Sequence, residues 1–302
     1  MSSDPAADAP FVREEIGRQP DSWLRAAALA PGLAGVLPRP GESVAVIGCG
    51  TSWFMATAYA GLREAAGQGR TDAFAASELP AGREYDRVVA ISRSGTTTEV
   101  VRAVTPVRSP VLAFTAVADT PVEEAATDTV VLDFADERSV VQTVFATTTL
   151  MLLRASLGES VDAAVAQARD VLAGQHLVDP ALASVEQISF LGRQWAYGIA
   201  QEAALKLREA CRLWTECYPQ MEYRHGPIAI AQPGRAVWVM GEPVPGLVED
   251  IDSTGALLVD DHLDPVVDLV RAQLLAVDRA EAAGLDPDRP RSLARSVVLA
   301  DS

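Results

Sequence analysis

Positive charge is scarce in this sequence. Its 302 residues include 25 Lys and Arg against 41 Asp and Glu, which gives a formal net charge of −16. A protein that binds DNA or RNA needs a basic surface to displace counterions from the phosphates, so no nucleic-acid partner is expected. One small phosphorylated ligand remains compatible with an acidic protein, because a few backbone N–H groups can hold a single phosphate.

Cysteine and long apolar runs are scarce as well. The three cysteines are too few for a disulfide framework, and none has the spacing of a metal site. No apolar stretch reaches the roughly 18 residues of a membrane span without a charge or a turn signal. The Ala/Asp/Pro-rich start has neither the basic nor the apolar segment of a signal peptide. We therefore expect a cytoplasmic protein with no membrane association, no metal and no other cofactor.

Short apolar runs that alternate with helical patterns make up most of the chain. This alternation predicts an α/β fold, with parallel sheets covered by helices on both faces. The predicted strands are Ser43–Gly48, Asp72–Ala76, Arg87–Ser92, Pro110–Thr115, Thr129–Phe134, Glu186–Gly192, Ala236–Met240 and Ala256–Val259.

The helical patterns differ in length. Over Phe11–Ala30 the pattern is interrupted by Pro20, which predicts two short helices joined there. The segment Gly246–Ile251 leaves room for about one turn, so one crossover is expected to be reduced. The other predicted helices are Ser52–Ala65, Thr97–Val104, Arg138–Leu157, Ser160–Ala173, Tyr197–Glu216 and Leu263–Ala283.

Two α/β halves are the simplest organisation of these elements. The tail could be a surface extension, but we expect it to close over a site. The predicted segments are a disordered tail (1–10), N-terminal helices (11–42), a first subdomain (43–158), linking helices (159–184), a second subdomain (185–285) and a C-terminal tail (286–302).

Two loops that follow predicted strands carry hydroxyl groups. In the first, Thr51 and Ser52 lie at a helix N-terminus, where unpaired N–H groups favour an anion. Trp53 replaces the third glycine of a dinucleotide fingerprint, and plain turn chemistry explains this loop equally well. The second loop, Ser92–Thr97, has four hydroxyls, one glycine and one guanidinium, more than helix capping needs. The predicted phosphate ligands are Thr51, Ser52, Ser92, Arg93, Ser94 and Thr97.

Acidic residues on one helix are candidates for proton transfer. Glu202 and Glu209 are seven residues apart, which places them on nearly the same helix face, and Glu209 is the candidate base. A solvated face with a Glu202–Lys206 ion pair explains the spacing as well. His225 lies in a Gly/Pro-bounded loop and has the chemistry of a proton shuttle, although a loop histidine can be incidental.

In combination, these motifs resemble the sugar isomerase (SIS) family, and in particular the double-SIS isomerase half of glucosamine-6-phosphate synthase and its stand-alone relatives. The resemblance covers nearly the whole chain past residue 11. It is carried by Glu15-Ile16…Gln19-Pro20, Cys49-Gly50-Thr51-Ser52, Ser92-x-Ser94-Gly95-x-Thr97, Ser139-Val140…Thr143…Phe145, Glu202-Ala203-Ala204-Leu205-Lys206-Leu207-x-Glu209, Glu222-x-x-His225-Gly226-Pro227 and Pro290-Arg291-x-Leu293-Ala294.

The resemblance implies a fold and a site. Each subdomain would be a flavodoxin-like, three-layer α/β/α unit, and the two hydroxyl loops would hold the phosphate of a hexose 6-phosphate. Glu209 would move a proton between C1 and C2. His225 would act in ring opening from a neighbouring subunit, which implies a homodimer with a shared site. The further sugar and tail contacts would be Ser139, Glu202, Lys206 and Arg295.

The sequence departs from the family's pattern in three ways. No segment matches the glutamine-hydrolysing domain of the synthases, so the activity of a complete synthase is not expected. Arg93 stands where the family often has Gln. Arg295 stands where the synthase tail has an imine-forming lysine, and arginine is a poor imine former because it stays protonated.

The leading hypothesis is a metal-independent isomerase or deaminase that removes the C2 proton of a hexosamine 6-phosphate. One alternative is a dehydratase or lyase that eliminates the C3 hydroxyl of an N-acetylhexosamine 6-phosphate; the absent tail lysine favours it. Another is a non-catalytic phosphosugar-binding regulator. Residues 1–42 are too short and too acidic for a DNA-binding segment of such a regulator, and the presence of Glu209 and His225 favours an enzyme.

Overall fold

Two parallel β-sheets form the framework of the protein. The structure is a computed structural model, and it describes residues 10–299. The first sheet has the strand order β2-β1-β3-β4-β5 and the second β7-β6-β8-β9. Every neighbouring pair of strands is parallel. The predicted fold class is confirmed. The boundaries of the predicted subdomains remain a prediction, and the predicted disordered tail (1–10) lies outside the described residues except for Pro10.

The first half of the chain supplies the first sheet and its helices. It begins with a long helix and ends with a helix that packs against it. In order, the elements are α1 (Phe11–Leu29), β1 (Val44–Gly48), α2 (Thr51–Ala65), β2 (Thr71–Ala75), β3 (Arg87–Ile91), α3 (Thr98–Val104), β4 (Val111–Thr115), α4 (Pro121–Ala125), β5 (Asp128–Val131) and α5 (Val144–Ser156).

The second half has a smaller sheet with shorter crossovers. Its α9 is short, as the sequence predicted. In order, the elements are α6 (Asp162–Leu172), β6 (Gln187–Gly192), α7 (Ala196–Cys211), β7 (Trp214–Pro219), α8 (Gln220–Tyr223), a 3₁₀ turn (Pro227–Ile230), β8 (Arg235–Met240), α9 (Leu247–Asp252), β9 (Leu257–Val259) and α10 (Pro265–Ala282).

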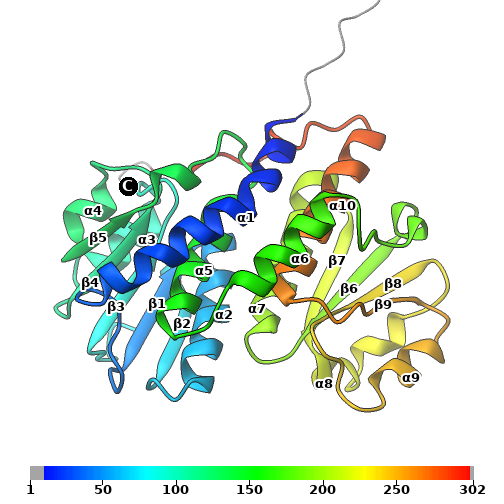
Figure 1. Cartoon of the computed structure of the whole chain (residues 1–302), viewed down its shortest axis with the longest axis horizontal. Coiled ribbons are helices and arrows are strands. Elements are labelled where there is room, and N and C mark those ends of the chain that lie inside the picture. Colours follow the sequence, from blue (N-terminus) through cyan, green and yellow to red (C-terminus); the bar gives the residue numbers. More distant parts are fainter. Residues whose placement is uncertain (1–9, 300–302) are drawn as a thin grey trace, which may run out of the picture.

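One core joins the two halves. Figure 1 shows the sheets on opposite sides of the molecule, with α1, α2, α5, α6, α7 and α10 between them. Val89 and Phe114 from the first sheet and Phe190 and Trp238 from the second are all buried in the same apolar cluster as these helices. The outer face of the first sheet packs on α3 and α4, and that of the second on α8 and α9. Burial of one continuous apolar surface therefore holds the two halves in a fixed arrangement.

Helix α1 corrects the prediction of two helices joined at Pro20. It is continuous from Phe11 to Leu29, with Pro20 inside it. A proline lacks the N–H that would bond to the carbonyl four residues earlier, here Ile16. The side-chain amide of the buried Gln19 donates to this carbonyl at 3.4 Å instead. A local side chain thus offsets the missing backbone bond.

Two other predicted helices were too long. Helix α5 starts at Val144 rather than at Arg138, because the buried carboxylate of Glu137 accepts from the N–H groups of Thr143, Val144 and Phe145 and so caps it. Helix α7 ends at Cys211, and the residues predicted to continue it form the edge strand β7.

None of the helices over residues 10–299 is long and apolar enough to cross a membrane.

Candidate functional site

The hydroxyl-bearing loops lie together at the carboxyl edge of the first sheet. Strands β1 and β3 are neighbours, and the chain leaves them in opposite directions of the strand order, toward β2 and toward β4. Ligands of parallel α/β sheets bind at this kind of switch point. Ser52 follows β1 and the hydroxyl loop, Ser92–Thr97, follows β3, so residues about 40 positions apart meet in one pocket.

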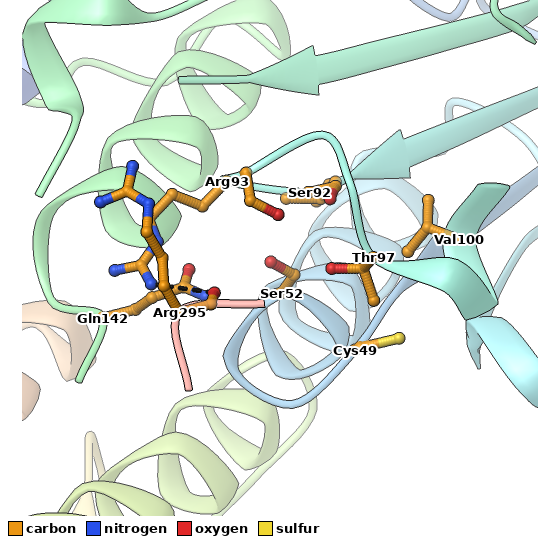
Figure 2. A pocket seen from close by; sticks show the side chains of 10 residues that line it. Cys49, Ser52, Ser92, Arg93, Thr97, Val100, Gln142 and Arg295 are labelled. Carbon is orange, nitrogen blue, oxygen red and sulfur yellow. Dashed lines mark hydrogen bonds between the residues drawn. The ribbon is translucent and has the colours of Figure 1, made fainter. Parts of the chain in front are cut away.

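The pocket itself is small and polar. Its cavity measures about 20 Å³. Figure 2 shows labelled hydroxyl side chains on one side of the pocket and the guanidinium groups of Arg93 and Arg295 on the other, beside Gln142. The lining residues are Cys49, Ser52, Ile91, Ser92, Arg93, Ser94, Thr97, Val100, Gln142 and Arg295.

Three buried polar atoms of the lining residues have no partner. The hydroxyl of Ser92, which is 4% exposed, the carbonyl oxygen of the Gln142 side chain and Nε of Arg93 make no hydrogen bond. A buried polar group without a partner costs about 1–3 kcal/mol, and such groups cluster where a ligand completes them. Ser92 was predicted as a phosphate ligand. Gln142 was missed, because residues 138–143 were assigned to a helix rather than to a loop at the pocket.

Arg93 lies in the pocket lining, but both terminal nitrogens of its guanidinium are occupied. It donates to the carbonyl oxygens of Ser139 at 2.9 Å, Val140 at 3.3 Å and Arg295 at 3.2 Å. The carboxylate of Glu137 lies 3.8 Å from Arg93 Nη1, and both side chains are buried. Burial lowers the pKa of Arg93 from its ordinary value, and Glu137 opposes this shift. These contacts fix the loop after β5 against the hydroxyl loop.

Of the predicted sugar contacts Arg295 and Ser139, only Arg295 lines the pocket. Its guanidinium donates to the carbonyl of Glu137 and pairs with Asp136. Ser139 is fully buried and lies outside the pocket lining. Its hydroxyl is bonded to the carboxylate of Glu15, whose pKa is raised by burial. In this chain Ser139 therefore supports the loop that carries Gln142.

Helix α7 brings a buried charge cluster to the first half. Nζ of Lys206 lies 2.6 Å from a carboxylate oxygen of Glu209 and 3.3 Å from one of Glu202, and it donates to the hydroxyl of Thr51 at 2.9 Å. Lys206 and Glu202 are each 1% exposed, whereas Glu209 is 18% exposed. The alternative of a solvated charged face is therefore wrong. Thr51, predicted as a phosphate ligand, instead links α2 to this cluster.

Two members of this cluster have shifted pKa values. Burial raises the pKa of Glu202 to about 8, against the opposing charge of Lys206. For Lys206, burial acts to lower the pKa, but the two carboxylates outweigh it and the net direction is upward. Lys206 is thus a stable cation beside the partly exposed Glu209. Arg208 is not part of this cluster, because it is exposed and donates to the carbonyl of Thr215.

Helices α2 and α7 cross at very short range. A Cβ atom at Gly198 would lie 2.5 Å from the carbonyl oxygen of Phe54, and one at Gly61 would lie 3.0 Å from the Cα of Trp195. Only glycine permits this approach of one backbone to the other. The crossing holds the helix that carries Glu209 directly against the helix that starts at the pocket.

His225 does not join this group within one chain. It is exposed in the segment between α8 and the 3₁₀ turn, and it is absent from the pocket lining. In the described part of the chain, residues 10–299, no group of three or more His, Cys, Asp or Glu side chains is placed to hold a metal ion.

Comparisons with known proteins agree with this architecture. The chain is 28% identical, over 96% of its length, to glutamine–fructose-6-phosphate aminotransferase (isomerizing) from Methanothermobacter thermautotrophicus, and it covers 57% of that protein. It thus spans about half the length of the curated relatives that it matches. No family model matches the chain.

Solved structures show the same fold. Glucosamine-6-phosphate deaminase from Thermotoga maritima has a TM-score of 0.80 at 23% identity, with 96% of this chain and 100% of that chain covered. The C-terminal domain of glucosamine–fructose-6-phosphate aminotransferase from Francisella tularensis has a TM-score of 0.75 at 22% identity, with 96% and 100% covered. The resemblance to the SIS family predicted from the motifs is confirmed.

Proposed function

We propose that this chain, which has the double-SIS fold and resembles the isomerase half of the synthases, is an enzyme that removes the C2 proton of a hexosamine 6-phosphate. The observation that carries the proposal is the position of Lys206. Its ammonium bonds to Thr51, at the start of the helix that enters the phosphate pocket, and to the carboxylate of Glu209. One cation therefore connects an anion-binding edge to a candidate base.

The phosphate would bind at the edge of the first sheet. Ser92 offers a buried hydroxyl without a partner, and Ser52, Ser94 and Thr97 add hydroxyls around the same pocket. Hydroxyls and backbone N–H groups satisfy a phosphomonoester through charge-assisted hydrogen bonds. In this arrangement Arg93 contributes positive charge near the phosphate while its N–H groups stay on the carbonyl oxygens.

The reaction would then occur beside α7. Glu209 takes the proton from C2 of the open-chain sugar, the electron pair forms a C1=C2 double bond, and the carbonyl oxygen at C1 takes up a proton to give an enediol or enolamine. Lys206, 2.6 Å from Glu209, holds this carboxylate in position before this step. Return of the proton to C1, with loss of the proton from the C2 hydroxyl, completes an aldose–ketose isomerisation. When the C2 substituent is a free amine, hydrolysis of the resulting imine by water releases ammonia.

Elimination is the second candidate, and Arg295 favours it. The residue that replaces the imine-forming lysine is a guanidinium paired with Asp136, and it cannot form an imine with a ketose. After C2 deprotonation of an N-acetylated sugar, the electron pair would instead expel the C3 hydroxyl, which leaves as water once protonated. The acetylated nitrogen cannot become an imine, so this outcome suits such a substrate.

A panel of hexosamine and N-acetylhexosamine 6-phosphates, followed by proton NMR in D₂O, tests the proposal. Deuterium at C2 of the recovered sugar reports proton removal, ammonia reports deamination and an alkene signal reports elimination. Calorimetric binding of a phosphosugar without exchange at C2 would contradict the enzyme hypothesis and favour the non-catalytic regulator.

We further propose that His225 reaches the site of a second copy in a homodimer, since it is exposed and remote from the pocket of its own chain. Two inactive variants, Glu209→Gln and His225→Asn, would then complement each other. Unfolding and refolding an equal mixture should restore about a quarter of the wild-type sites, because half of the dimers are mixed and each mixed dimer has one intact site. No recovery in a mixture that forms dimers would exclude a shared site.

A further inference from the structure

Ser296, near the end of the described residues, lies among the hydroxyl groups of the hydroxyl loop. Oγ of Ser296 lies 2.9 Å from the hydroxyl of Thr96, 3.1 Å from that of Ser94 and 3.4 Å from that of Thr97. One tail hydroxyl is thus surrounded by three loop hydroxyls, each of which could otherwise donate to an anion. Ser296 was not among the predicted site residues.

Neighbouring tail residues hold Ser296 in this position. The carbonyl of Val297 accepts from the N–H of Thr98 at 3.1 Å, and the N–H of Leu299 donates to the hydroxyl of Thr98 at 2.9 Å. On the other side of Ser296, the carbonyl of Arg295 accepts from Arg93. We call residues 295–299 the strap.

Arg295 attaches the strap to the loop after β5 as well. Its guanidinium pairs with Asp136 and donates to the carbonyl of Glu137. Arg93 and Arg295 are the two arginines that depart from the family's pattern, and here they contact each other and hold the strap. A lysine at position 295 could not make both contacts with one planar group.

Few donors remain for a phosphate group while Ser296 is docked among the loop hydroxyls. The cavity beside the strap is small, about 20 Å³. A phosphate group presents three further oxygens and a phosphorus atom, and it needs the donors that Ser296 engages.

We infer that the docked strap and a bound phosphate group exclude each other, with the hydroxyl of Ser296 taking the place of a phosphate oxygen until a phosphosugar displaces it. The inference rests on the proposed phosphate site. It makes the strap a built-in competitor, so the apparent affinity for phosphosugars is lowered by the fraction of molecules in which the strap is docked.

Calorimetry with inorganic phosphate and with glucosamine 6-phosphate tests this competition. Ser296→Ala removes the contacts to the loop hydroxyls and leaves those hydroxyls free, so both ligands should bind about 2- to 10-fold more tightly. Asp136→Asn loosens Arg295 and should act in the same direction. Val298→Ala is the matched control, because this side chain of the strap is 68% exposed, and its affinities should equal those of the wild type.

Hydrogen–deuterium exchange of the peptide that spans residues 293–299 provides a second readout. Saturation with either ligand should accelerate its exchange, since the N–H of Leu299 loses its acceptor when the strap leaves. The N–H of Thr98, which donates to the carbonyl of Val297, should exchange faster in its own peptide. Slower exchange, or weaker binding by Ser296→Ala, would mean that the strap closes over the ligand and would overturn the inference. Unchanged affinity in both variants would overturn it as well. If neither ligand binds to the wild type or to any variant, the phosphate site fails together with the inference.

Discussion

The two sheets repeat one backbone device with different side chains. Gly48 ends β1 and Gly192 ends β6; a Cβ on either would lie within 2.6 Å of the backbone four residues later. Two positions after each glycine the backbone turns with φ at +53°, at Gly50 in the first half and at Gln194 in the second. The following helices begin nearby, α2 at Thr51 and α7 at Ala196.

The chemistry at the two edges is nevertheless different. The first edge has the hydroxyl loop, whereas residues 241–246 after β8 contain no Ser or Thr. The second edge has a wider pocket, about 380 Å³, which is lined in part by Arg193, Glu242 and His262. Here Glu242 is bonded to His262 at 3.1 Å, and a carboxylate disfavours a phosphate. The backbone therefore creates two candidate edges, and the side chains leave anion binding to the first.

The second half contributes the reactive groups of α7 instead. Its charged cluster is buried against Thr51 and faces the first half rather than its own sheet edge. Because the hydroxyl loop is in the first half and the charged cluster is on α7, we predict that substitutions in the first half change phosphosugar affinity, whereas substitutions on α7 change turnover.

Glu209→Gln should give the largest effect. It keeps the shape of the side chain but cannot accept the C2 proton, so kcat should fall by about 10²–10⁴-fold with phosphosugar affinity nearly intact. Steady-state kinetics together with calorimetry measure both quantities. Glu249→Gln, on the exposed side of α9, is the matched control and should leave kcat unchanged. Exchange at C2 at the wild-type rate in Glu209→Gln would remove Glu209 from the base role.

Ser92→Ala tests the first edge directly. Loss of a hydrogen bond to a charged phosphate should weaken binding by about 1.5–3 kcal/mol. Folding stability should stay the same or rise slightly, because the deleted hydroxyl is buried without a partner. Calorimetry and urea unfolding give the two values, and Ser253→Ala at the end of α9 serves as the control. A loss of stability with unchanged affinity would show that Ser92 is structural.

Gly48→Ala and Gly192→Ala change the same backbone feature in the two sheets. Comparing them shows whether phosphosugar binding depends on the first sheet alone. Each added methyl meets backbone at less than 3 Å, so each should lower the free energy of unfolding by about 1–3 kcal/mol. Only Gly48→Ala should also weaken phosphosugar binding, since it displaces the start of α2 and with it Ser52. Equal losses of affinity in both variants would contradict the assignment of the phosphate to the first edge.

The second half should also give the protein a pH-dependent stability. Burial raises the pKa of Glu202 to about 8 and that of Asp268, on α10, to about 7. Both groups bind protons more tightly in the folded than in the unfolded protein, so their stabilising contribution is complete below the unfolded pKa values, near pH 4, and is lost as the pH rises through about 7 and 8.

Urea unfolding between about pH 5 and pH 9 should therefore show stability falling with pH, and Glu202→Gln and Asp268→Asn should each flatten the slope. A slope unchanged in both variants would mean that neither carboxyl is protonated in the folded state.

The sequence predicted most of the sheet framework because buried parallel strands are continuous apolar runs. Strand β7 escaped notice, because it is an edge strand whose side chains are partly exposed. The residue that follows the preceding helix, Arg212, is left-handed but is not glycine, so the sequence showed no stop signal between the helix and the strand. The break predicted at Pro20 was wrong for a different reason. The side chain of Gln19 replaces the missing backbone hydrogen bond, and this depends on a rotamer that a sequence does not display.

The hydroxyl loops were predictable because their residue types and their place after strands already point to anions. The contacts across the sequence were not. Thr51 was expected on a phosphate, yet it is bonded to Lys206, 155 positions away. Ser296 lies about 200 positions from the loop that it contacts. Such pairs are set by the packing of the halves, which leaves no local pattern in either segment.

The crossing of α2 and α7 has a consequence for substrate length. Because the backbones touch at Gly61 and Gly198, no flexible side chain between them can adjust the separation of the phosphate pocket from Glu209. Under the proposed function, the enzyme then selects sugars by the number of carbons between the phosphate and the acidic C–H bond. A pentose 5-phosphate anchored in the same pocket would present C1 to Glu209. That aldehyde carbon has no acidic proton to give, so the shorter sugar would bind without reacting.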